Sequence, residues 1–263
     1  MIIRSEPDRL RVTSQLDHAI LAGQFAAAWG GNGFSRPEPA DVVQLAASIH
    51  DEGWDLWEGA PHVNPANGCP YSFTDLPTDQ HLEIYTRCIG LAALRHPYAG
   101  LLVSMHGTGL YRQRYGHMPG LTHKPVRPEF QPLVDRFLIE QEALQARLRE
   151  QLEPPPQTLW THYRWLQVWD GMSVFLGLTD PAECREFSFG PVPVAPGGAE
   201  PVMTVAGTGP GTATVSPWPF EPGRVVAEMP VRFLPDRPYR DDDDFRATFA
   251  AAPVERLTIA LSA

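Results

Sequence analysis

The hydrophobic pattern of the chain changes near residue 180, and this change limits the folds available to it. Before that point, apolar residues recur every three or four positions, which is the spacing of amphipathic helices. After it, they alternate in short runs interrupted by proline and glycine, and 13 of the 28 prolines lie in residues 180–263. We therefore predict a mostly α, helical domain over residues 1–180. A β-rich C-terminal segment over residues 181–263 packs on it, which gives an α+β fold overall.

The same patterns predict the individual elements. Helices are expected at residues 8–29, 40–57, 79–95, 98–111, 128–151 and 158–178, and strands at 201–206, 211–216, 224–233 and 256–261. Two connections, residues 59–78 and 112–127, are longer than featureless loops usually are, which is typical of lids and binding loops. Four consecutive acids, Asp241–Asp244, are interpreted as a solvated loop or a charged flank of a strand rather than as a metal site.

Composition argues against several classes of protein. The 263 residues include 21 basic and 31 acidic side chains, so the formal charge is −10, and 43% of the residues are hydrophobic. This hydrophobic content excludes a disordered chain, and the acidic balance argues against a nucleic-acid or anionic-membrane partner. Three cysteines without a CxxC pair fit a reducing compartment. With no leader-like or membrane-spanning apolar run, the sequence predicts a cytoplasmic protein.

Several histidines and carboxylates occupy apolar stripes of the predicted helices. A buried carboxylate is costly unless it is paired or bound to a metal, and any single buried histidine is more often a hydrogen-bonded core residue than a ligand. Together, however, these groups suggest one shared centre. Imidazole with carboxylate is a ligand set for zinc, iron, manganese or nickel. The residues concerned are His18, His50, Asp51, His81, His106 and Asp170.

The order His18, then the doublet His50-Asp51, then Asp170 resembles the motif of the HD-domain superfamily. The resemblance spans residues 10–178 and implies an HD-like helical bundle. The strings QLDHAILAGQFAAAWG, HDEGWDLWE and LLVSMHGTGL further resemble an uncharacterised bacterial family with a His-Asp-x-Gly-Trp motif. The superfamily motif implies that these four residues bind one divalent metal ion.

The resemblance also implies a second metal site and an activity. In two-metal members the doublet aspartate, here Asp51, bridges the ions, while histidines on the two intervening helices, here His81 and His106, hold the second one. Most HD-like proteins resemble phosphohydrolases, so the implied activity is metal-dependent hydrolysis of a small phosphorylated substrate. Asp51 would then be catalytic, and Asp55, one helical turn further on, is the better candidate for a general base than Glu52.

An anionic substrate also needs a basic group nearby. Residues 112–127 provide a local positive cluster without acids, formed by Arg112, Arg114, Lys124 and Arg127, and Lys124 is the only lysine of the chain. We predict that this loop binds the substrate and closes over the metals. The alternative is a basic surface loop that offsets acids elsewhere.

Two other functions remain open from the sequence. A di-iron oxygenase could use the same scaffold, since the histidine-rich ligand set suits iron as well as it suits Mn, Zn, Ni or Mg. A non-catalytic metal- or ligand-binding protein is the second alternative. The β-rich segment either packs on the helical part or mediates assembly, which leaves a homodimer open.

Overall fold

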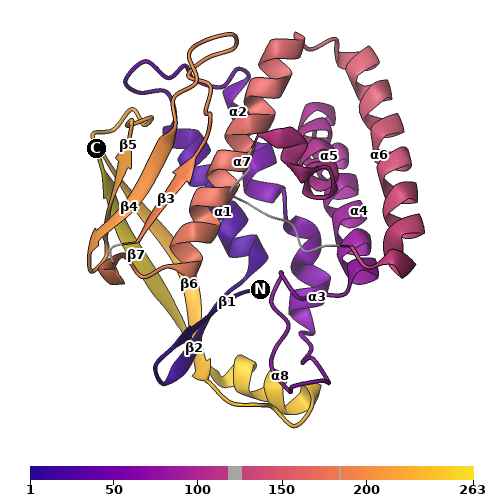
Figure 1. Cartoon of the computed structure of the whole chain (residues 1–263), viewed down its shortest axis with the longest axis vertical. Helices are drawn as coiled ribbons and strands as arrows, with labels where there is room; N and C mark the ends of the chain where they lie inside the picture. Colours follow the sequence, from indigo (N-terminus) through magenta and orange to yellow (C-terminus); the bar gives the residue numbers. More distant parts are fainter. Residues whose placement is uncertain (118–125, 184) are drawn as a thin grey trace.

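The computed structural model describes residues 1–117, 126–183 and 185–263 and shows an α+β fold. A curled seven-stranded sheet forms one side of the molecule (Figure 1). Helices α1 (Gln15–Ala28) and α7 (Pro156–Leu178) pack on it, and further helices cover these two on the other side. The helical part and the strand-rich part are thus layers of one body.

The predicted helices are present, with defined start and stop signals. They include α2 (Ala40–Ile49), α4 (Thr78–Arg95), α5 (Pro97–Tyr111) and α6 (Gln131–Leu152). Ser14 caps α1 by accepting a hydrogen bond from the Asp17 backbone N–H. Glu153 takes a left-handed conformation after α6, and Pro154 cannot continue that helix.

Two helix predictions were too long. The segment 8–29 begins with a strand, β2 (Arg9–Thr13), before α1 starts. The segment 40–57 is not continuous either, because α2 ends at Ile49 and is followed by a 3-10 turn (Glu52–Trp54) and the short helix α3 (Asp55–Gly59). The break falls at the His50-Asp51 doublet.

The sheet confirms the four predicted strands and adds three more. The predicted ones are β4 (Met203–Gly209), β5 (Thr212–Ser216), β6 (Arg224–Pro235) and β7 (Val254–Ser262). The additional ones are β1 (Ile2–Glu6), β2 and β3 (Glu186–Phe189). The order is β1-β2-β6-β7-β5-β4-β3, and neighbouring strands are antiparallel except β5 and β7.

The strands nearest the N-terminus complete the sheet of the C-terminal part. Strand β2 pairs with β6, so that Val12 lies opposite Arg232, and β1 pairs with the outer side of β2. Leu10 and Val12 are buried. The change of pattern near residue 180 therefore separates helices from strands along the sequence, while the sheet itself draws on both parts of the chain.

The acidic run Asp241–Asp244 is a helix start rather than a loop or the flank of a strand. Helix α8 (Asp242–Ala251) begins there, and Asp241 caps it by accepting a hydrogen bond from the Asp244 backbone N–H at 2.8 Å. Negatively charged side chains in the first turn interact favourably with the positive end of the helix dipole. Asp242 also accepts a hydrogen bond from the Val63 backbone N–H at 2.9 Å, which holds the long connection 60–77 against α8.

Helix α7 is the part of the helical layer that packs on the sheet, and it is buried on nearly every side. Its buried residues include polar ones such as His162, Arg164 and Asp170 beside Trp165 and Trp169. A helix that is covered all round needs apolar residues on all its faces, which explains the apolar run near its C-terminal end.

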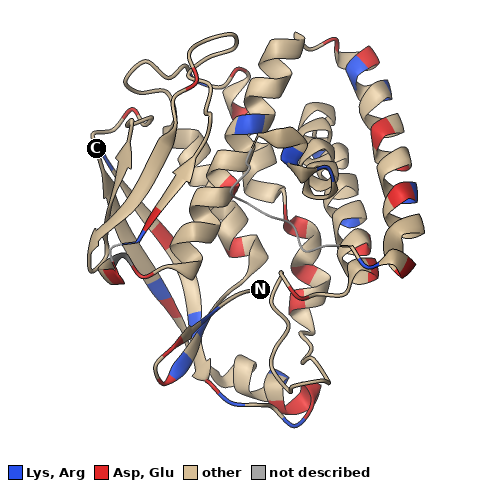
Figure 2. Ribbon diagram, in the orientation of Figure 1, with Lys and Arg blue, Asp and Glu red and all other residues tan. Residues whose placement is uncertain are grey.

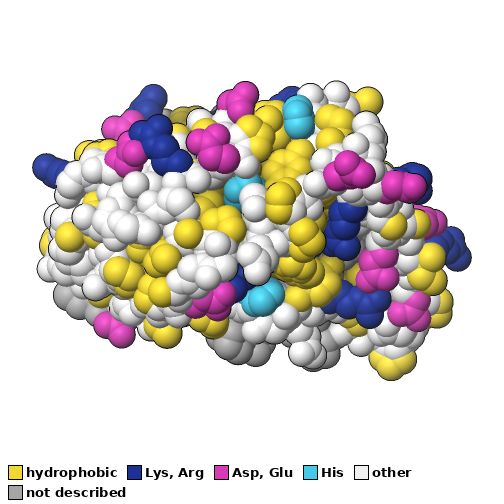
Figure 3. All heavy atoms as spheres, turned by 90° about the horizontal axis from the view of Figure 1, so that it is seen from above, with side chains coloured by type: hydrophobic (Ala, Val, Ile, Leu, Met, Phe, Trp, Pro, Cys, Tyr) yellow, Lys and Arg dark blue, Asp and Glu magenta, His cyan; other side chains and the backbone are white. Residues whose placement is uncertain are grey.

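Among the described residues, acidic and basic side chains are mixed on the surfaces that Figure 2 and Figure 3 show. Acidic and basic side chains occur together along the outer helix α6 (Figure 2). They are also interspersed on the face shown in Figure 3. Among the residues that the structure describes, none of the helices has the length and apolarity needed to span a membrane.

Candidate metal centre

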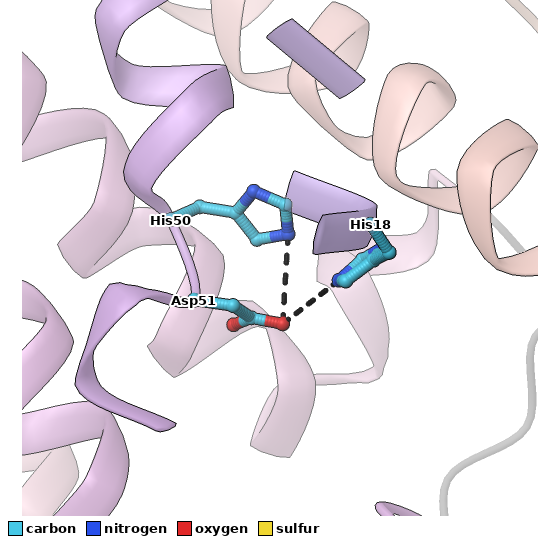
Figure 4. Close-up of side chains that lie close together, drawn as sticks. All are labelled: His18, His50 and Asp51. Atoms are coloured by element: carbon cyan, nitrogen blue, oxygen red, sulfur yellow. Dashed lines mark hydrogen bonds and ion pairs between the residues drawn. The ribbon is translucent and has the colours of Figure 1, made fainter. Parts of the chain in front are cut away.

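Three side chains from two helix ends and a turn meet in the interior of the helical layer. His18 is on α1, His50 follows the last residue of α2, and Asp51 starts the 3-10 turn (Figure 4). The Asp51 Oδ2 atom lies 3.0 Å from Nε2 of His18 and 3.7 Å from Nε2 of His50. All three residues are at most 2% exposed. This buried triad could hold a metal ion.

The end of α2 allows the two residues of the doublet to face the same point. His50 keeps helical backbone angles, whereas Asp51 has φ −114° and ψ 18°, outside the helical region. On a continuous helix, successive side chains are about 100° apart around the axis. Because the helix stops, the Asp51 carboxylate lies beside the imidazoles of both His50 and His18 (Figure 4).

The hydrogen bonds behind the histidines leave their Nε2 atoms directed to the triad. Nδ1 of His50 donates to the Ala47 carbonyl at 2.8 Å. The Ser173 hydroxyl donates to the Asp170 carbonyl, so its oxygen accepts a hydrogen bond from Nδ1 of His18 at 2.8 Å. A histidine that donates through one ring nitrogen presents the other to a metal, and such outer contacts are typical of metal sites.

Two buried polar atoms of the triad have no hydrogen-bond partner, and both are suitable metal ligands. They are Nε2 of His50 and Oδ1 of Asp51, while Oδ2 of Asp51 accepts a hydrogen bond from the Gln15 amide at 3.1 Å. Unpartnered buried polar groups are costly. Two ligands at about 2.1 Å from a common ion lie roughly 3.0–3.4 Å apart, close to the separations of 3.0 and 3.7 Å found here.

Asp170 lies next to the triad and is shared with a buried arginine. Its Oδ1 atom is 3.7 Å from Nε2 of His50, and its Oδ2 accepts a hydrogen bond from Arg114 at 3.2 Å. Arg114 also donates to the Gln167 side-chain oxygen. Asp170 can therefore contribute one oxygen toward the triad while the other stays with the guanidinium.

The charges of the centre stabilise one another. Burial alone would lower the pKa of His50, but the carboxylates of Asp51 and Asp170 outweigh it and raise that pKa to about 9. Burial opposes ionisation of Asp51, yet His50 and His18 lower its pKa to about 2. The pKa of Asp170 is also well below its usual value, because the nearby His50 imidazole and the charge of Arg114 outweigh burial.

His106 and His81, the two histidines expected at a second metal, are each hydrogen-bonded to another side chain through Nδ1. The ring of His106 packs against that of His50 with centroids 4.9 Å apart, and its Nδ1 lies 2.9 Å from the amide nitrogen of Gln167. Burial lowers the pKa of His106 to about 3. Nδ1 of His81 is hydrogen-bonded to the Tyr111 hydroxyl at 2.6 Å, and the ring of Tyr85 contacts both histidines.

Asp55 does not reach the centre. It forms a two-pronged ion pair with Arg87 on α4 and is 40% exposed. Its predicted position, one turn from Asp51, assumed a continuous helix, and the helix ends before that turn. Glu52 pairs with Arg95 on α4.

Of the basic loop residues, Arg114 lies at the centre. Arg112 pairs with Glu142 at 2.7 Å and Arg127 with Glu129 at 3.2 Å, and both arginines are exposed. Lys124 lies outside the described residues.

Three supporting residues were absent from the sequence-based site. They are Gln15, Gln167 and Ser173, each hydrogen-bonded to a histidine or carboxylate of the centre. A signal for them exists in the sequence: Gln15 precedes His18 by three positions, while Gln167 and Ser173 lie three positions before and after Asp170. Residues three apart share a helix face, so each of these side chains lies on the face of a predicted ligand.

Comparisons with known proteins identify a family and no characterised relative. No curated protein and no solved structure matches the chain. A family model described as "Protein of unknown function (DUF3891)" matches residues 1–236, a range that includes the whole candidate centre and strands from both ends of the sheet. Since this match covers most of the sequence, the chain belongs to the DUF3891 family.

Proposed function

We propose that this protein is a metal-dependent hydrolase of the HD-domain type that acts on a small phosphorylated substrate. His18, His50 and Asp51 would hold a divalent ion, with Asp170 as a fourth ligand. The observation that carries the proposal is the buried triad, in which Nε2 of His50 and Oδ1 of Asp51 lack partners. A bound divalent ion supplies a Lewis acid that activates water and offsets charge on phosphoryl oxygens.

The residues around the triad supply what a phosphate ester would need besides the ion. The Arg114 guanidinium is buried at the centre and is held by Asp170 and Gln167. A guanidinium suits phosphate because its planar donors match two phosphate oxygens. The burial of the carboxylates strengthens the electrostatic interactions within the site.

The experiment combines metal analysis with an assay for phosphate release. Purified protein should contain close to one equivalent of a divalent metal, measured by mass spectrometry. The metal-loaded protein should release phosphate from a panel of nucleotides and sugar phosphates. Asp51→Asn and His50→Gln should lose both the metal and the activity, whereas His162→Gln should retain both. His162 is a matched control because it is a buried histidine whose Nδ1 is hydrogen-bonded to Tyr98.

Two results would contradict the proposal. A protein whose metal content is unchanged in Asp51→Asn does not use the triad as its metal site. Iron in the site with oxygen-dependent turnover and no phosphate release would instead indicate an oxygenase on the same ligands.

A further inference from the structure

The third histidine of the centre, His106, differs from His18 and His50 in the group that contacts its Nδ1 atom. In His18 and His50 that contact is an acceptor, the Ser173 oxygen and the Ala47 carbonyl respectively. In His106 it is the side-chain amide nitrogen of Gln167, at 2.9 Å. An amide nitrogen only donates hydrogen bonds, so Nδ1 of His106 accepts one.

The orientation of the Gln167 amide is fixed by its second neighbour. A guanidinium has donors and no acceptor, and Arg114 contacts the Gln167 side chain on the atom assigned as oxygen. Exchanging the oxygen and nitrogen of this amide would place two donors face to face at Arg114. The chain of contacts from Asp170 through Arg114 and Gln167 to His106 therefore determines which end of the amide the imidazole meets.

This contact determines the state of the ring. A ring nitrogen that accepts a hydrogen bond carries no proton, so the proton of His106 is on Nε2. Metal ions bind imidazole through an unprotonated nitrogen. Neither nitrogen of His106 is then available, because Nδ1 is occupied by Gln167 and Nε2 is protonated. In His18 and His50 it is Nδ1 that donates, so Nε2 is the nitrogen that can bind a metal.

We propose that His106 is a neutral hydrogen-bond donor beside a one-metal centre and not a metal ligand, with Gln167 as the residue that positions its proton. The inference rests on the proposed metal centre and specifies it further. The His106 ring lies 4.9 Å from that of His50, centroid to centroid, so the imidazole borders the proposed ligand set. Its acceptor would be an oxygen of the anionic substrate.

Nitrogen NMR on protein labelled at histidine tests the tautomer without reference to activity. In the metal-free and the zinc-loaded wild type at neutral pH, Nε2 of His106 should give a signal of the protonated, pyrrole-like type. The His106→Ala variant identifies that signal. A pyridine-like, unprotonated Nε2 in the wild type would overturn the proposal.

The Gln167→Glu variant should reverse the tautomer. A carboxylate accepts hydrogen bonds, so it would take one from Nδ1 and leave Nε2 unprotonated, while still offering an oxygen to Arg114. Gln141→Glu is the matched control, since Gln141 is a buried glutamine whose side-chain oxygen accepts a hydrogen bond from Ser104. A His106 signal that changes equally in both variants would contradict the role of Gln167.

Zinc titration then separates a donor from a ligand. His106→Ala should still bind one equivalent, with an affinity within about tenfold of wild type, whereas His18→Ala should lose more than about 100-fold. Binding of inorganic phosphate to the zinc-loaded protein should weaken by about tenfold or more in His106→Ala, since a hydrogen bond to a charged group is lost.

The possible outcomes distinguish the two proposals. Two equivalents of zinc in the wild type and one in His106→Ala would make His106 a ligand, which overturns the present inference and leaves the hydrolase proposal standing. Unchanged phosphate binding in His106→Ala would remove the donor role. If the wild type binds no metal, the proposed function fails, and the nitrogen spectrum alone decides whether the proton is on Nε2.

Discussion

Gly53 shows how closely the turn that carries Asp51 packs on its neighbour. A Cβ atom at residue 53 would lie 2.6 Å from the backbone nitrogen of Cys88 and 2.7 Å from the carbonyl oxygen of Ile84, both on α4. The Gly53 N–H also contacts Sγ of Cys88 at 3.2 Å. The glycine of the His-Asp-x-Gly-Trp segment thus allows a backbone contact that fixes the turn after α2.

Gly53→Ala should therefore lower the free energy of unfolding by about 1–3 kcal/mol, because the added methyl group would force the turn and the backbone of α4 apart. Urea denaturation measures this. Gly59→Ala is the control, since no atom lies within 4 Å of the added methyl group, and its effect should stay within about 0.5 kcal/mol. Equal stability of both variants would mean that the turn has more freedom than this packing allows.

His50 links metal binding to proton release. With a pKa raised to about 9 by Asp51 and Asp170 against the effect of burial, it is protonated at pH 7 when no metal is bound. A metal requires its Nε2 lone pair, so binding should release about one proton at pH 7 and progressively less above pH 9. Calorimetry in buffers of different ionisation enthalpy measures this number. Binding without any buffer dependence at pH 7 would contradict the assignment of His50 as a ligand.

At the scale of elements, hydrophobic periodicity predicted the helices and the strands β4 to β7. It missed features that depend on tertiary contacts. Leu10 and Val12 of β2 continue into the apolar stripe of α1, so the strand reads as an extension of the helix. The break after Ile49 is supported by the contact of Gly53 with α4. Helix α8 begins with a run of acids, and such a run is also typical of a solvated loop. Its place in the first turn, where acids interact favourably with the positive end of the helix dipole, identifies it as a helix start.

The same distinction explains the outcome for the site. His18 and His50 lie on apolar helix faces, so periodicity alone places them in the interior, and the structure brings them together with Asp51. Asp55 was expected near Asp51 because an unbroken helix would put residues four apart on the same face. Since α2 ends at Ile49, the two residues do not share a helix face. Arg114 lies at the centre through three successive left-handed residues, Gln113, Arg114 and Tyr115, a backbone path that no periodic pattern encodes.

His162 on helix α7 is buried, and the fold opposes its protonation, as it does for His106 on α5. Burial lowers the pKa of His162 to about 4, while its Nδ1 is hydrogen-bonded to Tyr98 at 2.8 Å. Between the unfolded value of 6.5 and the folded value, the unfolded chain binds more protons than the native protein. Stability is therefore complete above pH 6.5 and falls as the pH is lowered toward 4.

His162→Gln should reduce this acid sensitivity. At pH 5 the wild type should lose about 2 kcal/mol through His162 relative to pH 7, and the variant should not have that part of the loss. Denaturation at the two pH values measures the difference. His106 adds an effect of the same sign in both proteins, so some sensitivity remains. A pH dependence identical to that of the wild type would show that His162 does not oppose protonation.

At the scale of the whole molecule, the two layers depend on each other. Helix α7 contacts α1 and α5 on one side and strands β1 and β3 on the other, so neither layer keeps its core without it. The sheet in turn needs β1 and β2 from the opposite end of the sequence. The match of the family model across residues 1–236 is consistent with a unit that includes both layers.

Unfolding should accordingly be a single cooperative transition. Six of the seven tryptophans lie between residues 29 and 169, in the helical layer, whereas far-ultraviolet circular dichroism reports helices and sheet together. The urea transitions followed by tryptophan fluorescence and by circular dichroism should superimpose. Two separated midpoints would indicate that the layers unfold independently.

The pairing of β2 with β6 also affects how the chain acquires its fold during synthesis. Val12 is made early, but its neighbour Arg232 emerges from the ribosome only after all the helices from α1 to α7. Until then, the edge of β2 that will pair with β6 has no partner. Contacts between distant parts of a sequence form slowly. The segments that carry His18, His50 and Asp170 are therefore synthesised before the sheet beneath them can close by the pairing of β2 with β6.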